Sequence, residues 1–419
     1  MKNHMTRIVG IILITIFICP LWATELENKP EPKIEKQGNN WFFSGFNFDG
    51  YGKETHGLKG LVEVETDTIL AQQQGRYGII GHSQGGLRVL AYATYLKDNY
   101  PEQYKNLKGV ITVSGIDKGL KALEGGVGPL KSKLYTDADI LWKGAKGIVA
   151  AVPFLDILIA ELSFIEDVSA LAGANLFMEF VLSMLPSNYT GYIEPALRTG
   201  NLDELAEIKD MVPRSDFIKE YVAEVVEEPA RREIGTRTKL VLRSKKVWFF
   251  TVWYIAFVTE KIYQNYTIYH DVPKFDRSLP VGYFVGLNKD TLSMAGDKKS
   301  DIQDYLGLYT GLGAMAIPLH VAKCAVLWGL FTGSPVHIVN IGKGMDWTVN
   351  YQREIDELMG SPEHDGLVAK ESQFYPKKYS DKILGNEEDG YNAYPEYNHM
   401  TIMNVTTEDY MRKLLNAII

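Results

Sequence analysis

The chain has 419 residues, of which 46% are hydrophobic and 23% are charged, and its formal net charge is −8. This length can bury a large core in one or two domains, and the composition is that of a globular protein rather than a disordered one. The acidic balance argues against nucleic acid as a partner, because nucleic-acid-binding proteins need a basic face. It does not exclude a lipid surface, where apolar area can carry the binding.

The N-terminus has the features of a secretory signal peptide. Two basic residues precede the apolar run 8–20, and Ala23 supplies a small residue for cleavage. The run is shorter than the roughly 20 residues that a membrane-spanning helix needs. We therefore expect residues 1–23 to direct export, either to a periplasm or out of the cell. The alternatives are an N-terminal membrane anchor and a lipoprotein modified at Cys19.

A strand, a tight turn and a helix are predicted between residues 77 and 101. Residues 77–80, Tyr-Gly-Ile-Ile, form a short apolar run that is typical of a buried strand. Residues 87–96 are mostly compatible with a helix, and Pro101 lies just beyond its expected end. The sequence Gly-His-Ser-Gln-Gly-Gly occupies the turn between them.

Ser83 is the serine on this turn and the candidate nucleophile. A turn this sharp strains the serine backbone, and glycines at positions 81 and 85 remove side chains that would collide with the flanking strand and helix. The start of the helix also supplies N–H groups and partial positive charge where an oxyanion would form. These features predict a nucleophile elbow.

The GHSQGG sequence resembles the nucleophile elbow of bacterial lipases and related α/β-hydrolases. Residues 110–119 also resemble the next strand and loop of lipases, although Ile116 and Asp117 stand where those enzymes usually have Pro-His. The resemblance covers residues 40–120 and 278–419. It implies an α/β-hydrolase fold with a mostly parallel central sheet, and a triad in the chain order Ser, acid, His.

His399 is the candidate base. It is the one histidine in the last fifty residues, and it lies shortly before an amphipathic C-terminal helix. That helix is expected to start at a capping-box pattern beginning with Thr406. A loop histidine before the last helix occupies the position of the base in this fold.

Asp365 is the candidate acid, in a segment that resembles the acid loop of bacterial lipases. Its Asp-Gly turn should expose the carboxylate, while residues 367–368 anchor the loop to the core. The main rival is Asp290, just after an expected strand at 281–286. The neighbouring His364 is expected to be a solvated turn residue rather than a second base.

The oxyanion hole is expected to use the backbone N–H groups of Gln84 and Phe46. Residues 41–47 are expected to form an early strand that runs into a turn, and Phe46 lies in that turn. This chain has Ser44-Gly45 where lipases commonly have His-Gly. No cofactor is expected. No calcium site is expected at Thr401, where several lipases have a calcium-binding Asp.

The expected catalytic core comprises residues 24–120 and 275–419, with a helical insert at 295–345. Residues 121–274 are expected to form a large, mainly helical cap or lid, in which acidic residues interrupt the apolar stretch 147–186 and exclude a comfortable membrane span. The alternative is that such helices complete the core. Residues 247–258 could form a hairpin, a strand or a helix.

These features predict a serine hydrolase that cleaves carboxylic esters through an acyl-enzyme. An apolar cap favours lipid, acylglycerol-type esters and transient contact with a lipid surface. The alternatives are a short-chain carboxylesterase or phospholipase with the same triad, and a non-catalytic protein that binds an apolar ligand.

Overall fold

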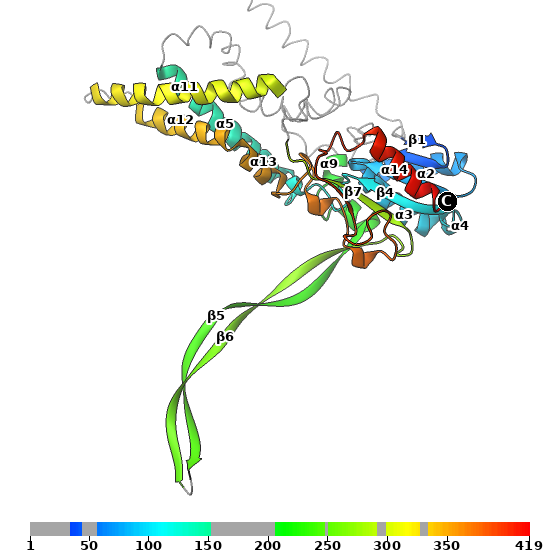
Figure 1. The fold of residues 1–419 in the computed structure, drawn as a ribbon, viewed down its shortest axis with the longest axis horizontal. Helices are drawn as coiled ribbons and strands as arrows, with labels where there is room; N and C mark the ends of the chain where they lie inside the picture. Colours follow the sequence, from blue (N-terminus) through cyan, green and yellow to red (C-terminus); the bar gives the residue numbers. More distant parts are fainter. Residues whose placement is uncertain (1–33, 44–56, 152–205, 248–249, 291–298, 327–333) are drawn as a thin grey trace, which may run out of the picture. The chain divides into compact units, whose positions relative to one another are not determined.

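The structure is a computed structural model, and it describes residues 34–43, 57–151, 206–247, 250–290, 299–326 and 334–419 (Figure 1). The expected signal peptide, the expected oxyanion donor Phe46 and most of the apolar stretch 147–186 lie outside these residues. The chain divides into two compact units. The main unit comprises residues 1–223 and 273–419, and the second unit is Glu224–Val272.

The main unit contains a six-stranded sheet in the order β1-β2-β3-β4-β7-β8. Its strands are β1 (Ile34–Gln37), β2 (Asn40–Phe43), β3 (Tyr77–His82), β4 (Leu107–Val113), β7 (Val281–Gly286) and β8 (Asn392–Tyr394). β1 pairs antiparallel with β2, and all other neighbours pair parallel. The prediction of an α/β protein with a mostly parallel central sheet is therefore confirmed.

Helices cover both faces of this sheet, and alternate side chains of its strands belong to different hydrophobic clusters. Ile79 packs in the cluster that contains residues of α2 (Gly57–Gln72) and α3 (Gln84–Asn99). Its neighbour Ile80 packs in the cluster that contains residues of α14 (Val405–Asn416). Burial on both faces explains why these strands read as continuous apolar runs.

Helix α14 begins two residues earlier than expected. Its N-cap is Asn404, whose side-chain oxygen accepts a hydrogen bond from the Thr407 N–H at 2.8 Å. The predicted capping box starting at Thr406 is therefore wrong, because the asparagine two residues before it already caps the helix.

Residues 206–223, which were expected in the cap, belong to the core instead. The short helices α9 (Ala206–Asp210) and α10 (Asp216–Tyr221) lie in this segment. Met211 and Phe217 are buried in the same hydrophobic cluster as α3. The cap and core alternatives for the stretch 147–186 fall mostly outside the described residues.

A separate hydrophobic cluster joins four helices of the main unit. They are α5 (Val127–Ala151), α11 (Lys299–Val326), α12 (Ser334–Val349) and α13 (Tyr351–Met359). The short 3₁₀ helix η1 (Lys121–Leu123) precedes them, and its Leu123 belongs to the cluster that contains α2 and α3. The helical insert expected at 295–345 is thus helical where the structure describes it. Among the described residues, no helix is both long enough and apolar enough to cross a membrane.

The second unit is a long, twisted hairpin of two strands, β5 (Ala223–Val247) and β6 (Phe250–Pro273) (Figure 1). The prediction of a mainly helical insertion is wrong for this segment. It also resolves the three alternatives for residues 247–258, because the described part of this run belongs to the hairpin.

Candidate active site

Ser83 lies between the end of β3 and the start of α3, in a strained backbone conformation. Its φ of 57° and ψ of −123° are unusual for a residue with a side chain. Two backbone hydrogen bonds hold Ser83 in this conformation. The Ser83 N–H donates to the Val113 carbonyl, and the Ser83 carbonyl accepts from the Gly86 N–H. Such strain is characteristic of a nucleophile elbow.

Two glycines let the strand and helix approach each other. A Cβ atom on Gly81 would lie 2.2 Å from the Gly85 carbonyl oxygen, and one on Gly86 would lie 2.7 Å from the Gly115 Cα atom. As the sequence suggested, any side chain at position 81 would collide with the start of the helix. Gly86 provides a second close approach, which the sequence did not single out.

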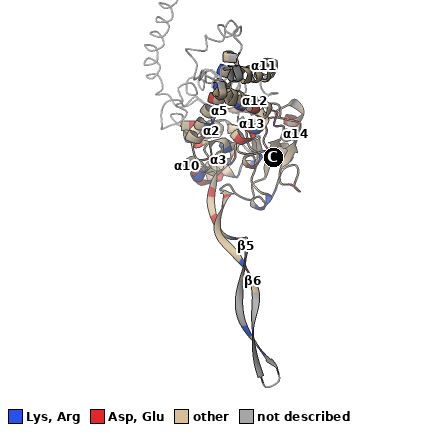
Figure 2. Ribbon diagram, turned by 90° about the vertical axis from the view of Figure 1, so that its left-hand side faces the viewer, with Lys and Arg blue, Asp and Glu red and all other residues tan. Residues whose placement is uncertain are grey.

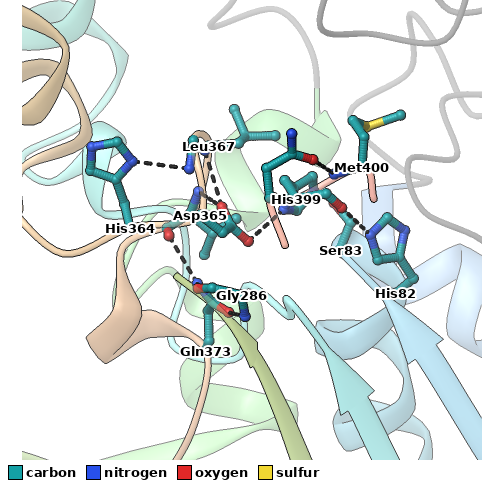
Figure 3. A network of polar contacts seen from close by, with 12 residues as sticks. His82, Ser83, Gly286, His364, Asp365, Leu367, Gln373, His399 and Met400 are labelled. Atoms are coloured by element: carbon teal, nitrogen blue, oxygen red, sulfur yellow. Dashed lines mark hydrogen bonds and ion pairs between the residues drawn. The ribbon is translucent and has the colours of Figure 1, made fainter. Parts of the chain in front are cut away.

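The structure brings Ser83, His399 and Asp365 together in the predicted chain of contacts (Figure 3). His399 Nε2 lies 2.8 Å from Ser83 Oγ, and His399 Nδ1 lies 2.9 Å from Asp365 Oδ2. All three side chains are almost completely buried. His399 lies on the loop between β8 and α14, as expected.

The loop around Asp365 is built to hold a charged carboxylate away from water. The N–H groups of Leu367 and Val368 donate to Asp365 Oδ1 at 3.0 and 2.7 Å, and Gly366 has the φ of 99° that this turn needs. Burial alone raises the pKa of Asp365, but the His399 charge and these hydrogen bonds outweigh it and lower the pKa below its usual value. The expectation of an exposed carboxylate is wrong, because Asp365 is fully buried.

The rival acid Asp290 does not occupy this position. It is half-buried just after β7, and its N–H donates to the Asn288 side chain at 3.0 Å. The His399 nitrogen that faces an acid is bonded to Asp365.

His364 is buried rather than solvated. Its Nδ1 atom accepts a hydrogen bond from the Gly366 N–H at 3.0 Å, so Nε2 carries the proton and donates to Asp356 Oδ1, also at 3.0 Å. The side chain therefore connects the acid loop to α13. The expectation of a solvated turn residue is wrong. The sequence did not show that the preceding helix α13 would place the Asp356 carboxylate next to His364.

His82, the residue before the nucleophile, makes a contact that the sequence reasoning missed. Its Nε2 atom lies 2.8 Å from the backbone carbonyl oxygen of His399, and the two imidazole rings are 5.0 Å apart. Burial and the nearby His399 charge lower the pKa of His82 to about 4. His82 is thus neutral at pH 7 and donates to the loop that carries His399.

Gln373 is a second buried side chain, and the sequence did not predict its role. Its amide oxygen accepts from the Gly286 N–H at 3.1 Å, and its amide nitrogen donates to the Val368 carbonyl at 3.0 Å. It therefore fastens the acid loop to the end of β7 (Figure 3). Its position eight residues after Asp365 is the feature of the sequence that could have suggested a contact with the acid loop.

Gln84, the predicted first oxyanion donor, is the first residue of α3. Its backbone N–H therefore belongs to the positive end of the helix, next to the nucleophile. The other predicted donor, Phe46, lies outside the described residues.

The part of the chain that the structure describes contains no group of three or more His, Cys, Asp or Glu side chains placed to hold a metal ion. The Thr401 hydroxyl, at the position of the lipases' calcium-binding Asp, donates to the Asn398 side chain at 3.0 Å. It serves to fold the loop that carries His399.

A search with models of known protein families gives no match, and a search of curated proteins gives none either. The case for the chemistry of this site therefore depends on its own geometry.

Proposed function

We propose that this protein is an exported serine hydrolase of the α/β-hydrolase fold, which cleaves carboxylic esters through an acyl-enzyme. The observation that carries the proposal is the continuous contact from Ser83 Oγ through the His399 imidazole to Asp365, on a strained turn between strand and helix. A serine, a base and an orienting acid within hydrogen-bond reach are the requirements of nucleophilic acyl transfer.

The roles of the three side chains follow from their contacts. The Nδ1–H of His399 donates to Asp365, which leaves Nε2 free to accept the Ser83 proton. The Ser83 oxygen attacks the ester carbonyl, and the Gln84 N–H stabilises the developing oxyanion. His399 then protonates the leaving alcohol and next activates the water that releases the acid.

Lipid esters are the substrate class that we favour. The helices α11 and α12 expose several large apolar side chains to solvent, among them Met315, at 62% exposure, and Val336, at 61%. Exposed apolar side chains on a helical insert suit contact with acyl chains or with a lipid–water interface.

The test is hydrolysis of a chromogenic ester series, from short to long acyl chains, by the mature protein and its Ser83→Ala variant. Ser278→Ala is the matched control, because it removes an exposed serine hydroxyl from the same unit. We expect loss of activity only in Ser83→Ala, by a factor on the order of 10⁶ as for other triad nucleophiles.

The acyl-length profile distinguishes the enzyme alternatives. Rates that rise with chain length support a lipase, and rates confined to short esters identify a carboxylesterase. Equal activity of the wild type and Ser83→Ala would remove Ser83 as nucleophile. A folded but inactive wild type that binds fatty acids would identify a non-catalytic apolar-ligand-binding protein.

A further inference from the structure

The hairpin β5–β6 presents its side chains to solvent along most of its described length. Four of the exposed large apolar side chains of the chain lie on β6, namely Ile262, Tyr263, Tyr266 and Tyr269, at 40–49% exposure. None of the hydrophobic clusters of the described residues includes a member of Glu224–Val272. A two-stranded ribbon is marginally stable in water, so this long one has a surface that needs a partner.

Positive charge is concentrated on the part of the hairpin nearest its turn. We call residues 231–247 and 250–261 the basic ribbon. It contains eight Lys and Arg against two Asp and Glu, a net charge of +6 in a chain whose total is −8. The acidic residues of the hairpin lie mostly at its other end, at Glu224, Glu227, Glu228 and Asp271 (Figure 2).

Half of the basic residues of the ribbon form no ion pair within the described residues. Lys261 forms an ion pair with Glu233 at 2.8 Å, and the Arg231 guanidinium lies 4.0 Å from the centre of the Tyr263 ring. Four exposed basic side chains form no ion pair within the part of the chain that the structure describes. They are Arg232, Arg237, Arg243 and Lys245.

The two strands of the basic ribbon differ in composition. The end of β5, residues 239–247, carries four Lys or Arg, whereas residues 250–258 of β6 contain one polar residue, Thr251. The β6 segment includes Trp253 and Tyr254, residue types that concentrate at the boundary between lipid headgroups and acyl chains. Basic residues beside such a segment attract anionic headgroups.

We propose that the basic ribbon binds the surface of a lipid bilayer that contains anionic phospholipids. The charge of the ribbon is complementary to the headgroups, and the apolar run of β6 matches the interfacial layer beneath them. This run argues for lipid over nucleic acid, which offers no apolar layer. The proposal does not depend on the proposed function, since it concerns binding and not hydrolysis.

The hairpin lies at the surface of the bilayer and does not cross it. A spanning strand needs about 9–11 residues that suit lipid, and β5 is charged at the corresponding positions. The outer edges of a two-stranded ribbon also carry backbone N–H and C=O groups that lipid cannot satisfy.

The experiment is sedimentation with two kinds of vesicle, phosphatidylcholine alone and phosphatidylcholine with 30% phosphatidylglycerol, using Ser83→Ala so that no lipid is consumed. The test variant adds Arg237→Glu, Arg243→Glu and Lys245→Glu. The matched control instead adds Lys377→Glu, Lys378→Glu and Lys382→Glu, which change the net charge equally at exposed sites of the main unit.

We expect the parent to bind the anionic vesicles and to release them as salt rises. Because each basic residue near an anionic surface contributes a factor of about 5, the test variant should bind at least about 100-fold more weakly. The control should bind within a few-fold of the parent. Circular dichroism of each variant establishes that it is folded.

Three outcomes would overturn the proposal. The first is a folded parent that does not bind anionic vesicles, and the second is equal weakening by test and control variants. In the third, sedimentation equilibrium shows that the parent self-associates and the test variant does not, while the monomeric protein binds no vesicles. That result would assign the exposed strand edges to a second copy of this chain.

Discussion

The carboxylate of Asp365 stays charged inside the protein because three N–H groups point at it. Two come from the backbone of its own loop and one from the His399 ring. Without them, burial would favour the protonated acid, which could not stabilise an imidazolium. The loop geometry is therefore part of the catalytic design that we propose.

Replacing Asp365 with Asn should lower kcat by about 10⁴-fold, because an amide can stabilise the wrong imidazole tautomer. Steady-state hydrolysis of a soluble ester measures the effect. Asp290→Asn, the rival acid, is the control and should leave kcat within a few-fold of the wild type. A large loss in Asp290→Asn with little loss in Asp365→Asn would exchange their roles.

His82 should act as a positioning residue for His399. His82→Phe removes the donor to the His399 carbonyl and leaves that buried carbonyl unpaired, so we expect kcat to fall by roughly 10-fold, equivalent to about 1–2 kcal/mol. His82→Gln retains an N–H at a similar position and should recover most of the rate. Equal rates for Phe, Gln and the wild type would contradict the role.

The same histidine should make stability depend on pH. Its pKa is near 6.5 when unfolded and about 4 in the native state, so the unfolded chain binds the extra proton as the pH falls through this window. Between pH 7 and pH 5 the wild type should lose about 2 kcal/mol more unfolding free energy than His82→Gln. Urea unfolding at both pH values measures it, and an equal loss would refute it.

The contacts among Ser83, Asp365 and His399 could be predicted, because the proposed chemistry demands particular residue types in a fixed chain order. Supporting residues could not, because their roles depend on contacts between distant segments. His82 binds a carbonyl 317 positions away, and Gln373 bonds to Gly286, 87 positions away. No local pattern records such contacts.

At the scale of elements, the strand–turn–helix unit around Ser83 depends on close backbone approach. Gly81→Ala should destabilise the protein by about 1–3 kcal/mol, because its Cβ would lie 2.2 Å from the Gly85 carbonyl oxygen. Gly128→Ala in α5 is the control, since its Cβ meets nothing within 4 Å, and it should be neutral or stabilising by up to about 1 kcal/mol. Thermal unfolding compares them, and equal shifts would show that the approach can relax.

The elements that could be predicted are those whose burial leaves a periodic or continuous apolar pattern. β3, β4 and α3 have such patterns because both of their sides meet the core. The hairpin has no such pattern, because both faces of its described part are largely exposed. Its apolar residues therefore do not alternate between a buried face and a solvent-exposed face. Likewise α9 and α10 are too short for a helical period to stand out.

For the whole molecule, we propose that the two units have different tasks, the reaction in the main unit and membrane attachment in the hairpin. The main unit contains the candidate triad and all the described hydrophobic clusters. The hairpin holds a concentration of positive charge in an acidic chain. An enzyme that acts on lipid needs both a reactive site and a means of staying at a surface, and the hairpin is our candidate for the second.

This division predicts the result of shortening the hairpin. Replacing residues 231–263 with an Asn-Gly turn should leave hydrolysis of a soluble ester unchanged and shift Tm by only a few degrees, because no described core cluster loses a member. Hydrolysis of esters in anionic vesicles should fall at least about 100-fold, following the loss of binding. The full-length Lys377→Glu, Lys378→Glu, Lys382→Glu variant should retain both activities. A collapse of Tm in the shortened protein would instead make the hairpin part of the cooperative core, and equal losses on soluble and vesicle esters would place its effect at the candidate triad rather than at the membrane.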